Sequence, residues 1–243
     1  MNVYHTPAYQ AHRQKYAFSF SEAHRVPSPG RTFVLPPGWS VHSRHYYAEQ
    51  GSFACRTARH QLLDSEGQMV YTWDNLNPDG EFYTLVPHAN GRHYLIFRED
   101  LYGYSVLETE TGQTLHYLPE KSWPWDKKGF LETFIWTDTA YDPRTNLLAA
   151  YGCYWGGGNN MQFLDFTHPL EEQDCAVWLD IHDVVDPEYD LYDDIDLERF
   201  GEDGFLSFRT LSAEDGSQGG FRFPEDSLLD LVQKKKLTSE ERG

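Results

Sequence analysis

A short turn ending in Gly-Gln occurs twice in the chain, and each time it joins two strand-like runs of apolar residues. The first turn contains Gly67, between the runs 60–63 and 69–71, and the second contains Gly112. Glycine supplies the positive φ that a tight hairpin requires. The two glycines are 45 residues apart. A period of about 40–50 residues that holds several short strands is typical of propeller blades.

Two further hairpins follow the same plan. The third joins residues 162–169 to residues 175–179, and the fourth joins residues 207–211 to residues 220–223 across a turn that contains Gly216. The strands of these hairpins depend on aromatic residues, Thr and Leu more than on Val and Ile, and these residue types also suit a pleated, half-buried surface.

An inner pair of strands precedes the hairpins. Residues 82–86 and 93–97 are joined by a turn with Pro and Asn, and a turn of the same kind joins residues 133–136 to residues 147–151. Apolar runs of this length between turn signals indicate strands rather than helices. Each unit then has four strands, which is one propeller blade. We therefore expect an all-β, β-propeller-like fold with about 4–5 four-stranded units.

The ends of the chain are less regular. Residues 1–50 are expected to be irregular or to supply a further unit or closing strands, with strand-like pieces at 32–35 and 45–47, and residues 51–224 contain the repeat units. Residues 225–243 place acids before lysines, which matches the dipole of a short C-terminal helix followed by a tail. We expect one domain overall.

The charge of the chain limits its partners. It has 20 Lys and Arg against 38 Asp and Glu, a net charge of −18. This charge repels phosphate backbones and anionic lipids, so we expect no nucleic-acid or membrane partner, and any protein partner should be basic. Three widely spaced cysteines (Cys55, Cys153 and Cys175) and a polar first segment favour a cytoplasmic location. The oligomeric state stays open.

The sequence contains no complete catalytic, metal or cofactor motif. His42 and His45 are three residues apart, but no carboxylate lies at a suitable distance for a zinc motif. The glycines 156–158 lead into a strand-like segment, whereas a phosphate-binding loop leads into a helix. Cys153 would need a distant histidine to become a nucleophile, and packing explains it as well. We expect no metal and no cofactor.

The stretch from Asp180 to Asp203 contains eleven acids and a single arginine, Arg199. Three interpretations are open. It is a solvated, partly flexible connection, a surface for a basic partner, or a calcium site, although the glycine and the closing glutamate of an EF-hand loop are missing.

Two short patterns resemble those of a set of bacterial proteins. Residues 132–136 read Glu-Thr-Phe-Ile-Trp and residues 152–155 read Gly-Cys-Tyr-Trp. The chain resembles an uncharacterised bacterial family that shares both patterns, and together with residues 97–104 the resemblance covers roughly residues 80–180. It implies no known activity. A wider, generic resemblance is to β-propeller repeats.

Seven residues form the candidate binding site, because they lie where inner strands meet their loops. Aromatic side chains mixed with one arginine and two aspartates are typical of binding hot spots, although the core of an aromatic-rich blade would look similar. Residues two apart on a strand share a face, so we expect two such pairs to converge. The seven are Arg98, Asp100, Tyr102, Trp136, Asp138, Tyr154 and Trp155.

The function that these features favour is a soluble binding module without catalysis of its own. One alternative is an acidic immunity or inhibitor protein that occupies the basic cleft of a nuclease-like partner. A second alternative is a hydrolase or lyase at the mouth of the propeller channel, with Asp100 or Asp138 as the base and Arg98 holding an anionic substrate.

Overall fold

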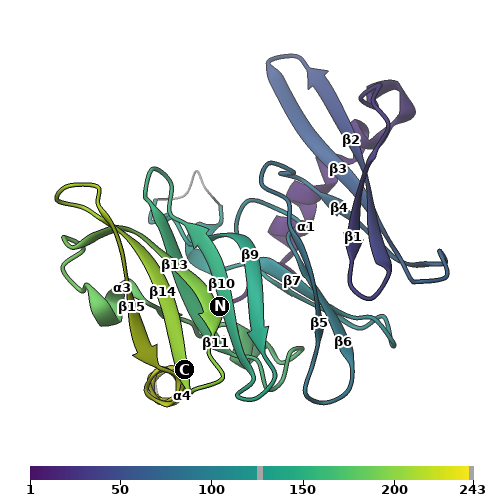
Figure 1. The fold of residues 1–243 in the computed structure, drawn as a ribbon. Helices are drawn as coiled ribbons and strands as arrows, with labels where there is room; N and C mark the ends of the chain where they lie inside the picture. The colour runs from purple at the N-terminus through teal and green to yellow at the C-terminus, as the bar shows by residue number, and fades with distance from the viewer. Residues whose placement is uncertain (125–127, 241–243) are drawn as a thin grey trace. The chain divides into compact units, whose positions relative to one another are not determined.

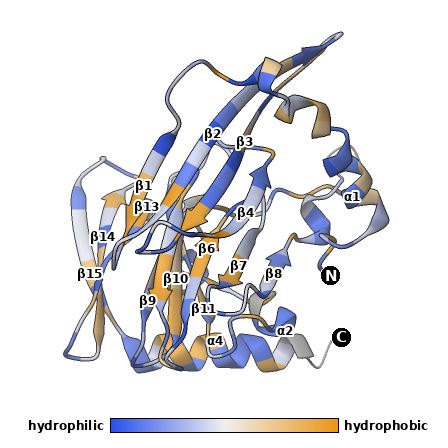
Figure 2. Cartoon of the chain, turned by 90° about the vertical axis from the view of Figure 1, so that its right-hand side faces the viewer, coloured by the Kyte–Doolittle hydropathy of each residue, from blue (hydrophilic) through white to orange (hydrophobic). Residues whose placement is uncertain are grey.

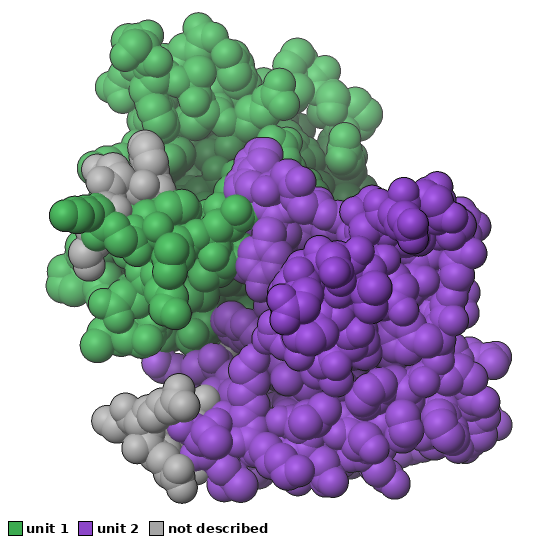
Figure 3. Space-filling view, turned by 90° about the vertical axis from the view of Figure 1, so that its left-hand side faces the viewer, with its two compact units in different colours: residues 1–86, 92–133 green, residues 87–91, 134–243 purple. Residues whose placement is uncertain are grey.

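Within residues 1–124 and 128–240, which the computed structural model describes, fifteen strands form four antiparallel sheets (Figure 1). Each sheet is a meander, since strands that pair are also neighbours in the chain, and among these strands no sheet closes on itself. A predominantly β fold is therefore confirmed. The chain divides into two compact units (Figure 3): the described parts of residues 1–86 and 92–133, and those of residues 87–91 and 134–243.

The first unit begins with helix α1 (Pro7–Gln14) and two short 3₁₀ helices (Ala17–Phe20 and Glu22–His24). Sheet one contains β1 (Arg31–Leu35), β2 (Trp39–Gln50), β3 (Phe53–Leu63) and β4 (Met69–Asn75). Sheet two contains β5 (Tyr83–Pro87), β6 (His93–Phe97), β7 (Tyr104–Glu108) and β8 (Thr114–Tyr117). A third 3₁₀ helix (Glu120–Ser122) follows.

The second unit contains the other two sheets and the C-terminal helix. Sheet three contains β9 (Ile135–Asp142), β10 (Leu147–Cys153), β11 (Asn159–Asp165) and β12 (Leu179–Asp180). Sheet four contains β13 (Tyr192–Phe200), β14 (Phe205–Ser212) and β15 (Gln218–Pro224). The helices are α2 (Glu172–Cys175), α3 (His182–Val185) and α4 (Glu225–Glu240). No helix in the described part of the chain has the length and apolar character needed to cross a bilayer.

The hairpins at Gly67 and Gly112 are confirmed as β3–β4 and β7–β8, and both glycines have positive φ, 79° and 72°. At the first turn, the side chain of Asp64, the residue that follows β3, closes the loop. The carboxylate of Asp64 accepts hydrogen bonds from the backbone N–H groups of Glu66 and Gln68 at 2.9 and 2.8 Å. All the residues that form this turn are within a few positions of one another, which explains why the sequence alone predicted the hairpin.

The inner pairs and the fourth hairpin are also confirmed. Residues 82–86 and 93–97 fall in β5 and β6, and residues 207–211 and 220–223 fall in β14 and β15. The remaining inner pair lies in β9 and β10, but β9 continues to Asp142, so the turn is shorter than expected.

The third hairpin differs from the expectation. Its second strand was expected at residues 175–179, but β12 is only Leu179–Asp180, and the chain before it forms the short helix α2. The side chain of Asp174 is buried there, 2.6 Å from Lys236 of α4. Packing of this segment on the C-terminal helix therefore replaces the ladder hydrogen bonds of a longer strand.

The core of the first unit lies between sheets one and two. Val41 and Leu62 of sheet one are fully buried with Leu95 and Phe97 of sheet two. The ring of Phe97 lies 4.4 Å from that of Trp73. Burial of one such side chain contributes about 1.5–3 kcal/mol, so this face holds the two sheets together.

The core of the second unit lies between sheets three and four and one side of α4. Figure 2 shows hydrophobic residues concentrated on β10 and β11. Met161 and Phe163 of β11 are fully buried, as is Leu228 of α4. The ring of Phe163 meets that of Phe208 from β14 edge-on at 6.1 Å, a favourable geometry for aromatic pairs.

The long hairpin of β2 and β3 buries opposite faces in its two halves. Near the base, the paired residues Val41 and Leu62 are buried against sheet two. Toward the tip, the paired residues Tyr46 and Thr57 are buried. They belong to the other face of the sheet, because each lies five positions, an odd number, along its strand from Val41 or Leu62. The face that is covered at the base is therefore open at the tip.

The segment before β1 attaches to the first unit at two distant places. The hydroxyls of Ser19 and Thr57 share a hydrogen bond of 2.9 Å at the tip of the long hairpin. Asn2 donates to the carbonyl of His116 at 2.8 Å and accepts from the N–H of Leu118 at 3.0 Å. Asn2 and His116 are 114 residues apart in the chain.

The expected C-terminal helix is confirmed as α4, and its first residue belongs to a charged cluster. The guanidinium of Arg144 lies 3.1 Å from the carboxylate of Glu225, and Thr145 donates to the same carboxylate at 3.2 Å. Burial and the neighbouring carboxyl of Asp142 raise the pKa of Glu225 to about 7. The hydrogen bonds from Arg144 outweigh burial at Asp142 and lower its pKa.

Replacing Glu225 with glutamine should flatten the dependence of stability on pH. The folded protein holds a proton on Glu225 that the unfolded chain releases near pH 4.5, so stability should fall as the pH rises from about 5 through 7. Glutamine cannot ionise, so E225Q should lose less stability over this interval. Urea unfolding at pH 5 and pH 8 measures the effect, with the exposed Glu214→Gln as the control. Parallel profiles for the parent and E225Q would contradict the shifted pKa.

Candidate functional site

The seven sequence-predicted residues fall in different units. Arg98, Asp100 and Tyr102 belong to the first unit. The other four, Trp136, Asp138, Tyr154 and Trp155, belong to the second. Each group is therefore described by its surroundings within its own unit.

Arg98 is a buried structural residue and not the exposed one that the sequence suggested. Only 1% of it is accessible. Its guanidinium donates hydrogen bonds to the carbonyls of Asp79 at 2.6 Å, Gly80 at 2.9 Å and Leu101 at 3.2 Å. These bonds tie together two loops that precede and follow β5 and β6, so the group that was expected to hold an anionic substrate instead holds the backbone.

Asp100 and Tyr102 do come together. Both line a cavity of about 280 Å³ in the first unit. Asp100 accepts hydrogen bonds from the hydroxyl of Tyr9 at 2.9 Å and from the N–H of Leu101 at 2.7 Å. Four of the other nine lining residues are aromatic: His12, Tyr16, Trp123 and Phe130. The cavity has one carboxylate, and that carboxylate already accepts two donors.

Trp136 and Asp138 do not share a face of β9. Trp136 is 1% accessible, whereas Asp138 is exposed. Opposite β9, Tyr151 pairs with Asp138 and the next residue, Gly152, pairs with Trp136, so Thr137 is an extra residue in the ladder. This bulge breaks the alternation of side chains that the expected pair required. Trp136 therefore belongs to the core.

Tyr154 and Trp155 begin the loop between β10 and β11. The hydroxyl of Tyr154 donates to Asp180 at 3.1 Å, whereas Trp155 is 69% exposed. The loop lies against the start of β13, where a Cβ added at Gly158 would be only 1.8 Å from the carbonyl oxygen of Asp193. Glycine is therefore required for this close approach, which holds the loop beside the acidic segment.

Side-chain hydrogen bonds and a ring contact hold the acidic segment before β13 together. The carboxylate of Asp186 accepts hydrogen bonds from the backbone N–H groups of residues 190–192 at 3.1–3.2 Å. The ring of Tyr189 stacks on that of His182, with centroids 4.8 Å apart. Tyr189 and Leu191 are nevertheless each 52% exposed. The segment presents two large side chains to solvent from a fixed backbone.

Asp180 links the Trp155 loop to this segment. It accepts the hydrogen bond from Tyr154, and burial together with the charges of Asp180 and Asp183 raises the pKa of Tyr189. The exposed side chains around this point, here called the Trp155 surface, are Trp155, Glu188, Tyr189, Asp190, Leu191 and Asp193. Its three carboxylates form no ion pair with any residue that the structure describes.

One polar network, which the sequence did not indicate, is centred on β2 and β3 of sheet one. Ser43 and His60 face each other across β2 and β3, with Oγ 2.7 Å from Nδ1, and a carboxylate oxygen of Glu81 is 3.8 Å from Nε2. The residue types are those of a hydrolase triad. However, Ser43 and His60 are fully buried, and burial lowers the pKa of His60 to about 3. The network is therefore an internal support and not a reactive site.

A second network of the same composition lies in sheet two. Ser105 and His116 face each other across β7 and β8, and His116 Nδ1 is 2.7 Å from the carboxylate of Glu99. Arg13 from the end of α1 is 2.8 Å from the other oxygen of Glu99. The serine and histidine of each network are paired residues of neighbouring strands, so the strand register brings them together.

Among the side chains that the structure describes, no three His, Cys, Asp or Glu residues converge as a metal site requires. No family model matches the chain, and a search of curated proteins gives no match.

Proposed function

We propose that the protein is a binding module and that its Trp155 surface recognises a basic protein partner. One observation carries the proposal: three large apolar side chains, each more than half exposed, stand beside three carboxylates that lack cationic partners in the described chain. Exposed aromatic residues of this kind are the usual anchors of protein interfaces.

The order of the surface supports the proposal. The carboxylate of Asp186 fixes the backbone that carries Tyr189 and Leu191, and the close contact at Gly158 fixes the loop that carries Trp155. A surface that is already ordered loses less conformational entropy when a partner binds. The net charge of −18 would in addition attract a basic partner from a distance and speed its association.

The narrower form of this proposal is an inhibitor or immunity protein whose acidic surface covers the basic cleft of a nuclease-like partner. A propeller-like arrangement of the four meanders belongs to the same proposal. It is supported by the order of strands within each sheet, since every sheet is built from consecutive strands, as a blade is.

Binding of a labelled peptide that alternates arginine and phenylalanine tests the proposal by fluorescence anisotropy. The parent protein should bind it at 0.1 M salt and at least tenfold more weakly at 1 M, because the Debye length falls from about 10 to 3 Å. Trp155→Ala should weaken binding by at least tenfold, as expected for an anchor residue. Leu237→Ala removes an equally exposed apolar side chain on α4 and should have no effect.

Two double variants distinguish the effect of the carboxylates on the Trp155 surface from the effect of the net charge of the protein. Asp190→Asn with Asp193→Asn should weaken binding, whereas the control, Asp226→Asn with Asp230→Asn on α4, changes the net charge equally and should not. Equal losses in both pairs would show that binding follows net charge alone and would contradict the proposal. So would unchanged binding by Trp155→Ala, or equal binding of a glutamate–phenylalanine peptide.

A further inference from the structure

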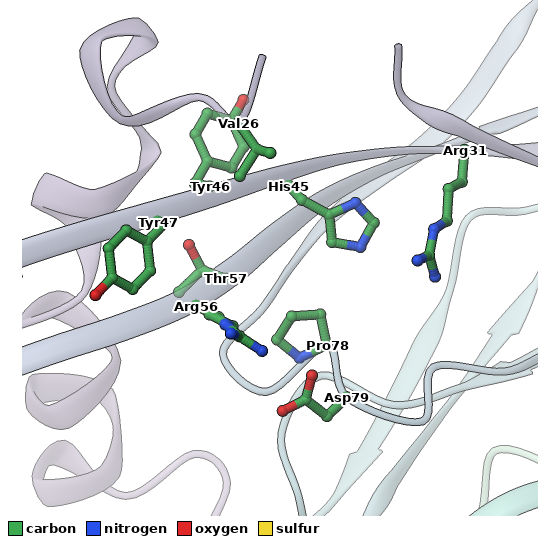
Figure 4. Close-up of a pocket in the computed structure, with 9 residues that line it drawn as sticks. All are labelled: Val26, Arg31, His45, Tyr46, Tyr47, Arg56, Thr57, Pro78 and Asp79. Atoms are coloured by element: carbon green, nitrogen blue, oxygen red, sulfur yellow. The ribbon is translucent and has the colours of Figure 1, made fainter. Parts of the chain in front are cut away.

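A second site, unrelated to the Trp155 surface, lies in the first unit on the open face at the tip of the long hairpin. A half-open pocket of about 500 Å³ lies there, a volume within the usual range for small-molecule sites. Figure 4 shows the side chains of His45, Tyr47 and Arg56 on the side of the sheet where Pro78 and Asp79 lie, whereas Tyr46 points away from them. We call it the Arg56 pocket.

Two arginines and a histidine line the Arg56 pocket. Arg31 comes from β1, His45 from β2 and Arg56 from β3. Arg56 forms no hydrogen bond or ion pair with the residues that the structure describes, although the protein as a whole is strongly acidic. The single carboxylate in the lining is that of Asp79.

A buried carboxylate lies behind the pocket, near His45 and Arg31. The side chain of Glu81 is 4% accessible, and its Oε1 lies 3.3 Å from His45 Nε2 and 4.0 Å from Arg31. Its Oε2 accepts a hydrogen bond from the hydroxyl of Tyr83 at 3.0 Å. Glu81 therefore places a buried carboxylate next to the lining side chains of His45 and Arg31.

The stretch of chain that supplies seven of the nine lining residues is basic, whereas the chain as a whole is acidic. Residues 1–60 contain seven Lys or Arg and two Asp or Glu, whereas the whole chain carries −18. A cationic pocket in an anionic protein has to attract its ligand by local contacts, since the overall field repels anions. Arginine forks supply such contacts, because they match phosphate and carboxylate oxygens in pairs.

We infer that the Arg56 pocket binds a small phosphate monoester that carries a hydroxyl group. Arg31 and Arg56 offer guanidinium donors from two different strands. Each guanidinium can pair with two oxygens, so the two together suit the three terminal oxygens and double charge of a phosphate better than the two oxygens of a carboxylate. Asp79 would accept a hydrogen bond from the hydroxyl of the ligand. The volume leaves room for a few carbon atoms beyond the phosphate group itself.

Calorimetric titration with glycerol 3-phosphate tests the inference. The parent protein should bind it, and Arg56→Gln should weaken the binding by at least tenfold. The matched control is Arg44→Gln, which removes an exposed arginine from the same two paired strands but on the opposite face. Arg44→Gln should bind like the parent. Inorganic phosphate should bind more weakly than the ester, and succinate more weakly still.

Each other outcome overturns the inference. No heat from the parent at millimolar ester would show that the pocket does not bind phosphate. Equal weakening by Arg56→Gln and Arg44→Gln would show a general charge effect, and no weakening by either would place the ligand elsewhere. Succinate binding as tightly as the ester would remove the assignment to phosphate. Circular dichroism of both variants, which change exposed residues only, should match that of the parent.

Discussion

Glu99→Ala is expected to lower the free energy of unfolding by about 3–5 kcal/mol, the loss usual when one partner of a buried ion pair is removed. The carboxylate is 5% accessible and contacts Arg13 at 2.8 Å and His116 at 2.7 Å. It also accepts hydrogen bonds from the hydroxyls of Tyr4 at 2.7 Å and Ser105 at 3.2 Å. Alanine would leave a largely buried guanidinium without its anion.

Chemical unfolding at neutral pH measures the loss, and Glu120→Ala is the control. Glu120 is an exposed carboxylate that lies 4.0 Å from the N-terminal amine, so its removal should change stability by no more than about 0.5 kcal/mol. Glu99→Gln keeps two hydrogen-bonding atoms and should fall between Glu99→Ala and the parent. A loss below about 1 kcal/mol for Glu99→Ala would contradict the role assigned to this network.

The same residue should make the protein sensitive to acid. Burial alone would raise the pKa of Glu99, but the hydrogen bond and charge of His116 and the charge of Arg13 hold it below its ordinary value of 4.5. A carboxyl with a lowered pKa stabilises the fold above its unfolded pKa and loses that effect as the pH falls further. Below about pH 4.5, the parent should therefore lose stability more steeply than Glu99→Gln does.

Arg98→Ala should lower the free energy of unfolding by about 3 kcal/mol, because three backbone carbonyls would lose their hydrogen-bond donor in a buried site. The carbonyls belong to Asp79, Gly80 and Leu101. Arg98→Lys keeps the charge but cannot reproduce the planar fork that reaches several acceptors at once, so it should also be destabilised. Thermal and urea unfolding give both values.

Arg44→Ala serves as the control for this pair, since it removes an exposed arginine of the same unit and should stay within about 0.5 kcal/mol of the parent. Unchanged stability of Arg98→Ala would show that the three hydrogen bonds are dispensable. Because Arg98 binds the carbonyls of Asp79 and Gly80, its loss should also loosen the loop that carries Asp79 into the Arg56 pocket.

The hairpins could be predicted because their signals are local. At Gly67 a single glycine and the carboxylate of Asp64 fix the turn, and both are within a few residues of the strands that they join. The C-terminal helix likewise followed from the order of acids and lysines along one segment. The short helix α2 was missed because its partner is Lys236, far along the chain.

The candidate site was harder to predict because burial depends on distant segments. Arg98 and Trp136 stand at strand ends in the sequence, yet one binds backbone carbonyls and the other lies in the core beside a bulge. Tyr154 and Trp155 were found from their aromatic loop. For residues 180–203 a connection, a surface for a basic partner and a calcium site all stayed open, because the run of acids does not show which side chains are exposed. The uneven charge of residues 1–60 was the one available signal for the Arg56 pocket.

The attachment of Asn2 to β8 has a consequence for the order in which the first unit is completed during synthesis. Asn2 is made 114 residues before His116, whose carbonyl it binds. At about 5–20 residues per second, roughly 6–23 s pass before that partner exists. The hydrogen bonds of Asn2 can therefore form only after β8 has been translated. During that interval Ser19 and Phe20 can already contact Thr57 and Tyr46 at the hairpin tip. The segment before β1 is then attached to the hairpin before its attachment to β8 can form.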